Sequence, residues 1–600
     1  MKSTVHKISG VIIWILYSNI LIYSSFYFNW QQHLYQYSEV IAALIIAIAL
    51  VTAVWLYSEK NEVMLKFKPG IFILSVMTGL TVNFLFFGKI FLYEETGYWL
   101  SAEGMHYFIL LFLPVYVYIL MSIFMLGIFK DVIQIKSDNT SINYKLSYKQ
   151  HYLILFAVQS FILGIYFYAL NPGNMSYDTY NQVCQLKGII PFNTWHPIGH
   201  TLFIGLLMKI WDNYAVITVF QILFFSAVTS AFYNILLKNN IKWQIVYITA
   251  IVMSAIPSTG INAVTQWKDI PFTVGLLWGT LILFKMIADK NYFKRNIHIF
   301  EFVFCLLSIS LFRFNGILAF ILMLIVAFIY VFKSRNAVQK RNFYISAITI
   351  LTVFILINSI IPHKLNAVPN PSGMKLRSIY QGLAAMYVYS AENDLSEESR
   401  QSIESVCTPE QMNEFYNPYF ADTISSNTPG FLNNLSKIKT SDALKMYVEA
   451  VIARPNVIIG DKLNLTVTMW AVTKDPFSYN NAYTTVIQEE MKEEFGVRRS
   501  DNIMTAAVER AAEITYYENY LSNTLIWRPG FFLSLELILL FYLITKRDRR
   551  TRLFIPIICN AIIVFLTMPA QDFRYLWFIQ LIFPFLVLAC SVKLPEEQQK

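Results

Sequence analysis

Four short polar segments, far apart along the chain, carry residue types that could do chemistry. The first, 171–197, reads NPGNMSYDTYNQVCQLKGIIPFNTWHP and contains Asp178 and His196. A carboxylate here can act as a general base or ligate a metal ion. A structural role for Asp178 is the alternative, because an Asp in such a loop can cap the helix that follows. Both interpretations stay open from spacing alone.

The other three segments combine acidic and basic residues with aromatic ones. They read STGINAVTQWKDIPF (258–272), LFRFNG (311–316) and PAQDFRYLWF (569–578). Lys and Arg at such positions suit a phosphate anion. For the neighbours Lys268 and Asp269 in 258–272, the alternative is an ion pair with each other at the membrane interface. The charged residues of these segments are Lys268, Asp269, Arg313, Asp572 and Arg574.

The elements that position these segments are apolar helices. Of 600 residues, 56% are hydrophobic and 14% charged, against about 25% charged in a typical soluble domain. Apolar runs of about 20 residues are long enough to cross a membrane, and they are too long and too uniform for barrel strands. The net charge of +9 lies mostly in short loops between these runs, where positive charge sets topology. We therefore expect no nucleic-acid partner.

The pattern predicts an all-α polytopic membrane protein with about fourteen spans. The stretch 198–211, IGHTLFIGLLMKIW, is short for a span, and we expect a helix in the membrane interface there. Spans are predicted near 8–28, 38–57, 70–88, 106–129, 152–170, 214–237, 243–258, 270–288, 297–312, 316–333, 343–362, 529–545, 553–569 and 575–592.

The distribution of Lys and Arg predicts the orientation in the cell membrane. They are concentrated in one alternate set of loops, which we assign to the cytoplasm together with both termini. Residues 363–528 contain no apolar run long enough to span, and they are predicted to form a mainly helical extracytoplasmic domain. The expected domains are a four-helix membrane module (1–150), a catalytic membrane module (151–362), the extracytoplasmic domain (363–528) and a three-helix membrane module (529–600).

In this topology the four polar segments all lie on the outer face of the membrane. Carboxylates, a histidine, a lysine and two arginines would then line one outward cavity. Basic residues would hold a phosphate group, and a carboxylate would remove a proton. The set predicts a reaction on a phosphate-linked substrate at the outer leaflet.

Several motifs resemble the integral membrane glycosyltransferases of C-type fold (GT-C), which include protein O-mannosyltransferases and lipid A aminoarabinose transferases. The likeness is to a bacterial branch of that group, and it covers roughly residues 150–595. The motifs are SYDTYNQ (176–182), TWHPIGHTLF (194–203), QWKDIPF (266–272), RFNG (313–316), FRYLW (573–577), MKLRSIYQGLAAM (374–386) and YNPYFAD (416–422).

The resemblance implies roles for individual residues. It makes Asp178 the essential acidic residue, with Asp269 and His196 as further catalytic residues. The same two carboxylates would hold a divalent ion, Mg or Mn, if the enzyme uses one; the acidic pairs of the family are often Asp-x-Asp-like, whereas each loop here offers a single Asp. No other cofactor is expected. The residues expected to bind substrate are Tyr177, Trp267, Lys268, Arg313, Asn315, Arg377, Arg574 and Tyr575.

The implied function is an inverting glycosyltransferase that uses a polyprenyl-phosphate-linked sugar as donor. Its partners would be this membrane lipid and an acceptor hydroxyl on a cell-surface glycan or protein. Two alternatives stay open. A polysaccharide polymerase would share the outer site, whereas a flippase or transporter for lipid-linked glycans would show polar residues through the mid-membrane and matching inverted halves.

Overall fold

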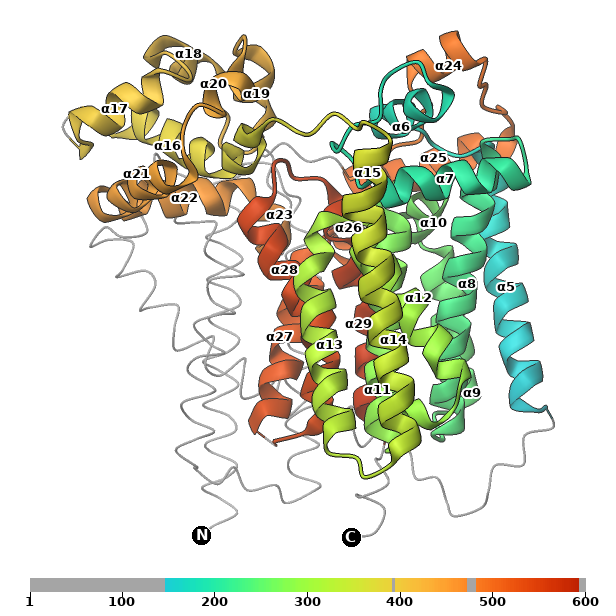
Figure 1. The fold of residues 1–600 in the computed structure, drawn as a ribbon. Helices are drawn as coiled ribbons and strands as arrows, with labels where there is room; N and C mark the ends of the chain where they lie inside the picture. The colour runs from blue at the N-terminus through green and yellow to red at the C-terminus, as the bar shows by residue number, and fades with distance from the viewer. Residues whose placement is uncertain (1–145, 391–393, 472–481, 546, 593–600) are drawn as a thin grey trace, which may run out of the picture. The chain divides into compact units, whose positions relative to one another are not determined.

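The computed structural model describes residues 146–390, 394–471, 482–545 and 547–592 (Figure 1). Of these residues, 146–533 and 549–592 belong to one compact unit, and Ser534–Asp548 belongs to a second. The predicted spans near 8–28, 38–57, 70–88 and 106–129 lie outside the described residues.

The described residues are helical, which confirms the all-α class for this part of the chain. They contain no β-strand, only isolated bridges between loops. Local sequence explains several helix ends. Ser147 and Gln150 form a capping box at the start of α5, and Gly188 ends α6 in the left-handed conformation that favours glycine.

The apolar helices form a bundle around α11 (Asp269–Ala288), which is almost wholly buried, whereas α14 (Ala337–Ile355) lies at the edge. Short helices α6 (Tyr177–Lys187) and α10 (Pro257–Val264) lie at one end of the bundle (Figure 1). The other helices of this part are α5 (Tyr148–Ala169), α7 (Ile198–Ile210), α8 (Ala215–Lys238), α9 (Trp243–Ala255), η2 (Tyr292–Lys294), α12 (Ile297–Phe312), η3 (Phe314–Gly316), α13 (Ile317–Phe332), η4 (Leu356–Ile360), α15 (Ile361–Lys364), η8 (Arg549–Phe554), α28 (Ile555–Thr567), η9 (Phe573–Tyr575) and α29 (Trp577–Ser591). Helix α27 (Pro529–Thr545) begins in this unit, and its residues from Ser534 onward belong to the second.

Six helices in the described residues are long and apolar enough to cross a membrane, or up to eight if each of two bent helix pairs counts as one span. The predicted number of about fourteen is not supported. Helix α12 has 16 residues and α29 has 15, which at 1.5 Å per residue is shorter than the roughly 30 Å hydrocarbon core. The predicted span 243–258 corresponds to α9, which ends at a 62° bend before Pro257.

Helix α7 corresponds to the stretch predicted to lie in the interface. Its 13 residues are too few to cross a bilayer. Figure 1 shows it running across the ends of the long helices rather than alongside them.

Residues 363–528 divide between two groups of helices. The first, called the helical domain here, runs from α16 to α23 and has its own apolar core, in which Tyr380, Met412 and Phe431 are buried. Its helices are α16 (Arg377–Tyr389), α17 (Glu397–Glu404), α18 (Pro409–Phe415), α19 (Asp422–Asn427), α20 (Phe431–Leu435), α21 (Thr440–Ala453), α22 (Pro455–Leu465) and α23 (Val467–Trp470), preceded by η5 (Ser372–Leu376).

The second group packs on the membrane helices instead. It comprises α24 (Glu489–Phe495), α25 (Ile503–Glu513), η7 (Ile514–Glu518) and α26 (Tyr520–Trp527). The Thr505 hydroxyl, in the first turn of α25, donates to the carbonyl of Ala169 at the end of α5. Both groups lie at the same end of the bundle, called the domain end below (Figure 1).

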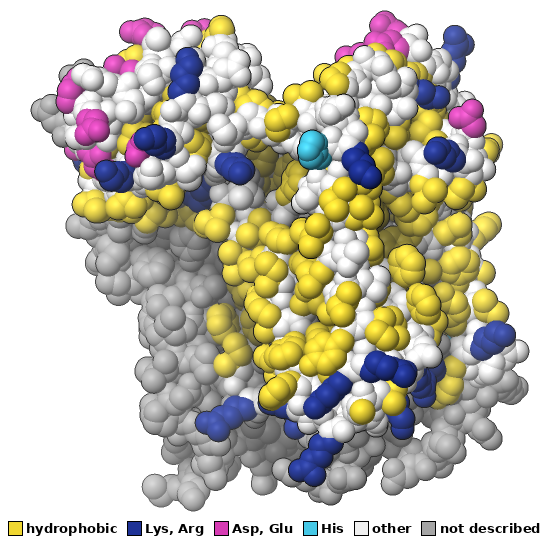
Figure 2. All heavy atoms as spheres, viewed as in Figure 1, with side chains coloured by type: hydrophobic (Ala, Val, Ile, Leu, Met, Phe, Trp, Pro, Cys, Tyr) yellow, Lys and Arg dark blue, Asp and Glu magenta, His cyan; other side chains and the backbone are white. Residues whose placement is uncertain are grey.

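The surface of the bundle agrees with a membrane environment. Figure 2 shows hydrophobic side chains over the middle of α13 and α14, and Lys and Arg side chains gathered at the end opposite the helical domain. The loop between α13 and α14 lies at that basic end and contains Lys333 and Arg335.

This charge distribution generates a topology prediction. A reporter inserted at Ser436, between α20 and α21, should report the extracytoplasmic side, because the basic end of the bundle favours the cytoplasm. A reporter inserted at Ser334 should report the cytoplasm. Paired alkaline phosphatase and fluorescent-protein fusions measure this, and the orientation is wrong if the two sites report the same side or the reverse assignment.

Candidate functional site

Two of the polar segments are joined edge to edge at the domain end. The amide of Asn174 donates to the carbonyl of Val264 (3.1 Å), and the amide of Gln266 donates to the carbonyl of Asn174 (2.9 Å). Gly173 is required for this approach, because its φ is +119° and an added Cβ would lie 2.2 Å from the Thr218 hydroxyl. The backbone thus fixes the start of α6 beside the start of α11.

Asp178 lies in the first turn of α6, and it is not the cap of that helix. The side chain of Ser176 is the N-cap and accepts from the amide of Asp178 (3.3 Å). The same hydroxyl accepts from the indole N–H of Trp267 (2.8 Å). The capping alternative for Asp178 is therefore wrong, and its carboxylate is free to bind other groups.

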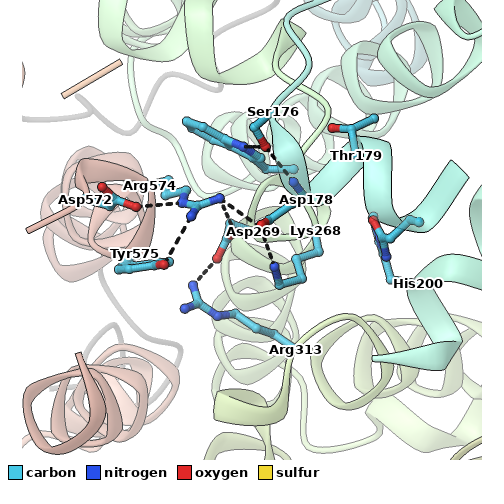
Figure 3. A network of polar contacts seen from close by, with 12 residues as sticks. Ser176, Asp178, Thr179, His200, Lys268, Asp269, Arg313, Asp572, Arg574 and Tyr575 are labelled. Carbon is cyan, nitrogen blue, oxygen red and sulfur yellow. Dashed lines mark hydrogen bonds and ion pairs between the residues drawn. The ribbon is translucent and has the colours of Figure 1, made fainter. Parts of the chain in front are cut away.

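Two cations from distant segments bind the carboxylate of Asp178 (Figure 3). Its Oδ2 lies 2.7 Å from Nζ of Lys268 and 3.0 Å from a terminal nitrogen of Arg574. Lys268 directly precedes α11, and Arg574 lies in η9. A single carboxylate oxygen therefore joins three segments of the chain.

Asp269, the first residue of α11, is completely buried and joins two arginines. Arg313 forms an ion pair with one oxygen of its carboxylate, and Arg574 lies 4.0 Å from the other. The expected alternative of an ion pair between Lys268 and Asp269 is wrong, because these neighbours bind different partners. Consecutive residues at the start of a helix point in different directions, so they do not face each other.

Arg574 is the residue that links the two carboxylates. Its Nε lies 3.1 Å from Asp572, a terminal nitrogen donates to the hydroxyl of Tyr575 (3.2 Å), and its guanidinium stacks 4.6 Å from the centre of the Trp267 ring. Arg313 lies 4.5 Å from the Tyr575 ring. Aromatic faces and carboxylates together orient both guanidinium groups.

Electrostatics set the protonation states of this charge cluster, which comprises Asp178, Lys268, Asp269, Arg313, Asp572 and Arg574. Burial alone would raise the pKa of Asp178, but the adjacent Lys268 and Arg574 hold that pKa well below its ordinary value. Asp178 is therefore ionised at neutral pH. His196 is buried, and burial together with the charge of Lys268 lowers its pKa to about 4, so its imidazole is neutral.

Within the described residues, Nδ1 of His196 is buried without a hydrogen-bond partner. A neutral ring with a free nitrogen beside the cluster can contact a polar group of a bound molecule. The nearby His200 differs, because its ring is bound by Gln182 and packs against Phe312.

The cluster is balanced in charge, with three carboxylates facing three cations. This arrangement does not fit a divalent metal ion such as Mg or Mn, because the carboxylates that would ligate it are already neutralised by ion pairs with Lys268, Arg313 and Arg574. Consistently, no group of three or more His, Cys, Asp or Glu side chains suited to a metal occurs in the part of the chain that the structure describes.

Within the described residues, three predicted substrate residues form no hydrogen bond or ion pair with the charge cluster. Tyr177 is 58% exposed and packs on Tyr180. The Asn315 side chain makes no hydrogen bond to another described residue. Arg377 forms an ion pair with Asp422; burial lowers its pKa, and the Tyr575 phenol opposes that shift.

Sequence reasoning missed the residues that hold the cluster in place. Ser176 fixes both the start of α6 and Trp267. The Gln266 amide donates to the carbonyls of Pro172 (3.3 Å) and Tyr214 (2.9 Å). Asp572 was noted as a charged residue but not as a site residue. The signals were present, since each lies within two residues of a predicted site residue.

No family model, curated protein or solved structure matches the chain. The likeness to C-type glycosyltransferases rests on the motifs quoted above.

The buried pair of Asp269 and Arg313 generates a stability prediction. Asp269→Asn leaves the buried guanidinium of Arg313 without its counter-charge, whereas Arg574 keeps Asp178 and Asp572. It should lower the free energy of unfolding by about 3–5 kcal/mol. Arg313→Gln should also destabilise. The free energy of unfolding of the double variant should fall by clearly less than the sum of the two single losses, because the double variant leaves no unpaired charge at this position. Thermal unfolding of the purified protein in detergent measures all three, and additive losses would contradict the pairing.

Proposed function

We propose that the protein is a membrane glycosyltransferase that transfers a sugar from a polyprenyl-phosphate donor to an acceptor hydroxyl at the extracytoplasmic face. The observation that carries this proposal is the charge cluster at the domain end of the apolar bundle. It combines cations suited to a phosphate with a carboxylate suited to a hydroxyl proton, at one end of helices that are long and apolar enough to cross a membrane. Four of the motifs that resemble C-type glycosyltransferases, SYDTYNQ, QWKDIPF, RFNG and FRYLW, contain residues of this cluster.

Lys268, Arg313 and Arg574 are proposed to hold the phosphate. Two forked guanidinium groups and one ammonium can donate several hydrogen bonds to its oxygens. Each is only partly exposed, with side-chain exposures of 15%, 12% and 13%. Limited water strengthens electrostatic contacts to a charge that develops during the reaction.

Phosphate binding is proposed to activate Asp178. While Lys268 and Arg574 contact its carboxylate, the low pKa of Asp178 makes it a weak base. When these cations turn toward a phosphate, the carboxylate loses their stabilisation and its pKa rises. The base is then strongest when the donor is bound.

The proposed step balances as a single displacement. The oxygen of the acceptor hydroxyl bonds to the anomeric carbon while the bond from that carbon to the phosphate oxygen breaks. The bonding electron pair leaves with polyprenyl phosphate, and the hydroxyl proton passes to Asp178. Attack opposite the leaving group inverts the anomeric centre. No metal ion takes part in this scheme.

The role of Asp178 can be tested in cells. Asp178→Asn keeps the size of the side chain but cannot accept the proton. We expect at least about a 100-fold loss of transfer, the lower range of what general-base catalysis contributes. Mass spectrometry of surface glycans should show the loss. In cells with the wild-type protein, the addition of one sugar would indicate a transferase, whereas the addition of a repeating unit would indicate a polymerase.

Asp501→Asn is the matched control, because Asp501 is an exposed, ion-paired carboxylate in the loop between α24 and α25, two helices at the domain end (Figure 1). It should leave the glycans unchanged. Near-normal glycans with Asp178→Asn, at equal amounts of protein in the membrane, would rule out the catalytic role.

A further inference from the structure

The segment that carries Arg574 is held by the helical domain. This connection, residues 566–575, runs from the last turn of α28 to η9. The hydroxyl of Ser378, in α16, donates to the carbonyl of Leu566 (2.7 Å). Lys462, in α22, donates to the same carbonyl (3.3 Å) and to the Ser378 hydroxyl (2.8 Å). A cation at this position also suits the negative end of α28.

The next residues of the connection, Pro569 and Ala570, bind the helical domain through their backbone. The amide of Ala421 donates to the carbonyl of Pro569 (2.8 Å), and Phe420 forms an isolated antiparallel bridge with Ala570. These contacts come from the YNPYFAD motif. The motif therefore contacts the segment that carries Arg574.

Gln571 is the last contact before the charged residues. Its side chain is buried, accepts from the Thr468 hydroxyl (3.0 Å) and donates to the carbonyl of Asn464 (2.8 Å). The next residue is Asp572, which pairs with Arg574. Successive residues of the connection are thus fixed to the domain up to the point where Arg574 turns toward Asp178.

We propose that the helical domain positions Arg574, and that Thr468 acts through Gln571 as a positioning residue for this arginine. The membrane helices supply Asp178, Lys268, Asp269 and Arg313, whereas the arginine that joins both carboxylates takes its place from an element outside the bundle. The site is complete only when the domain is docked. The proposal deepens the function proposed above, since it concerns the same phosphate-binding arginine.

The test compares Thr468→Val with a matched control in the full-length protein. Thr468→Val keeps the shape and removes the hydroxyl that binds Gln571. Thr466→Val removes an equally buried hydroxyl at the C-cap of α22, whose one hydrogen bond among the described residues goes to the carbonyl of Lys462, one turn earlier. Thr468→Ser keeps the hydroxyl and should behave as wild type.

Hydrogen exchange of residues 568–576 is the first readout, because it does not depend on any ligand. We expect Thr468→Val to speed exchange there roughly fivefold, the factor that one lost hydrogen bond is worth, and Thr466→Val to leave it unchanged. Ser378→Ala should act in the same direction as Thr468→Val. Unchanged exchange in both Thr468→Val and Ser378→Ala overturns the proposal.

Binding of farnesyl phosphate is the second readout. Thr468→Val should weaken it roughly fivefold when Arg574 is present and have no effect in an Arg574→Gln background. Equal weakening in both backgrounds overturns the proposal, because Thr468 would not act through Arg574. If Arg574→Gln itself binds farnesyl phosphate as well as wild type, the proposed phosphate role of Arg574 fails, while hydrogen exchange still decides how the connection is held.

Discussion

The ion pairs that join Asp178 and Asp269 through Arg574 are the constraint on which the domain end depends. Charges at the edge of an apolar bundle are costly unless they are paired, because little water reaches them. Here pairing is achieved only between segments that are distant in sequence, since the neighbours Lys268 and Asp269 face different partners. The start of α6, the start of α11, the end of α12 and the turn at η9 must therefore meet. Gly173 and Ser176 allow the close approach that this requires.

The same pairing explains why a site with three cations is neutral at rest. An anion that binds in the cluster must compete with the carboxylates for the three cations. The affinity of the site for that anion therefore depends on how well the anion replaces the contacts of the carboxylates. In the proposed function a lipid phosphate does this, and its entry frees Asp178 to act as a base.

Sequence patterns predict which charged residues meet better than they predict the number of spans. The predicted topology puts these charged residues at the same end of several apolar helices, where they need partners, and Asp178, Lys268, Arg313 and Arg574 do meet. Which cation binds which carboxylate did not follow, because it depends on side-chain direction. Composition also could not separate short buried helices such as α12 and α29 from full spans, since both are equally apolar. Ser and Asp both cap helices well, so the cap of α6 was not predictable either.

The most direct test of the central claim is a cryo-electron microscopy structure of the protein with farnesyl phosphate bound. The account predicts phosphate oxygens within hydrogen-bond distance of Lys268 and Arg574, and the carboxylate of Asp178 released from both. A phosphate bound elsewhere, with the contacts of Asp178 to Lys268 and Arg574 intact, would contradict it.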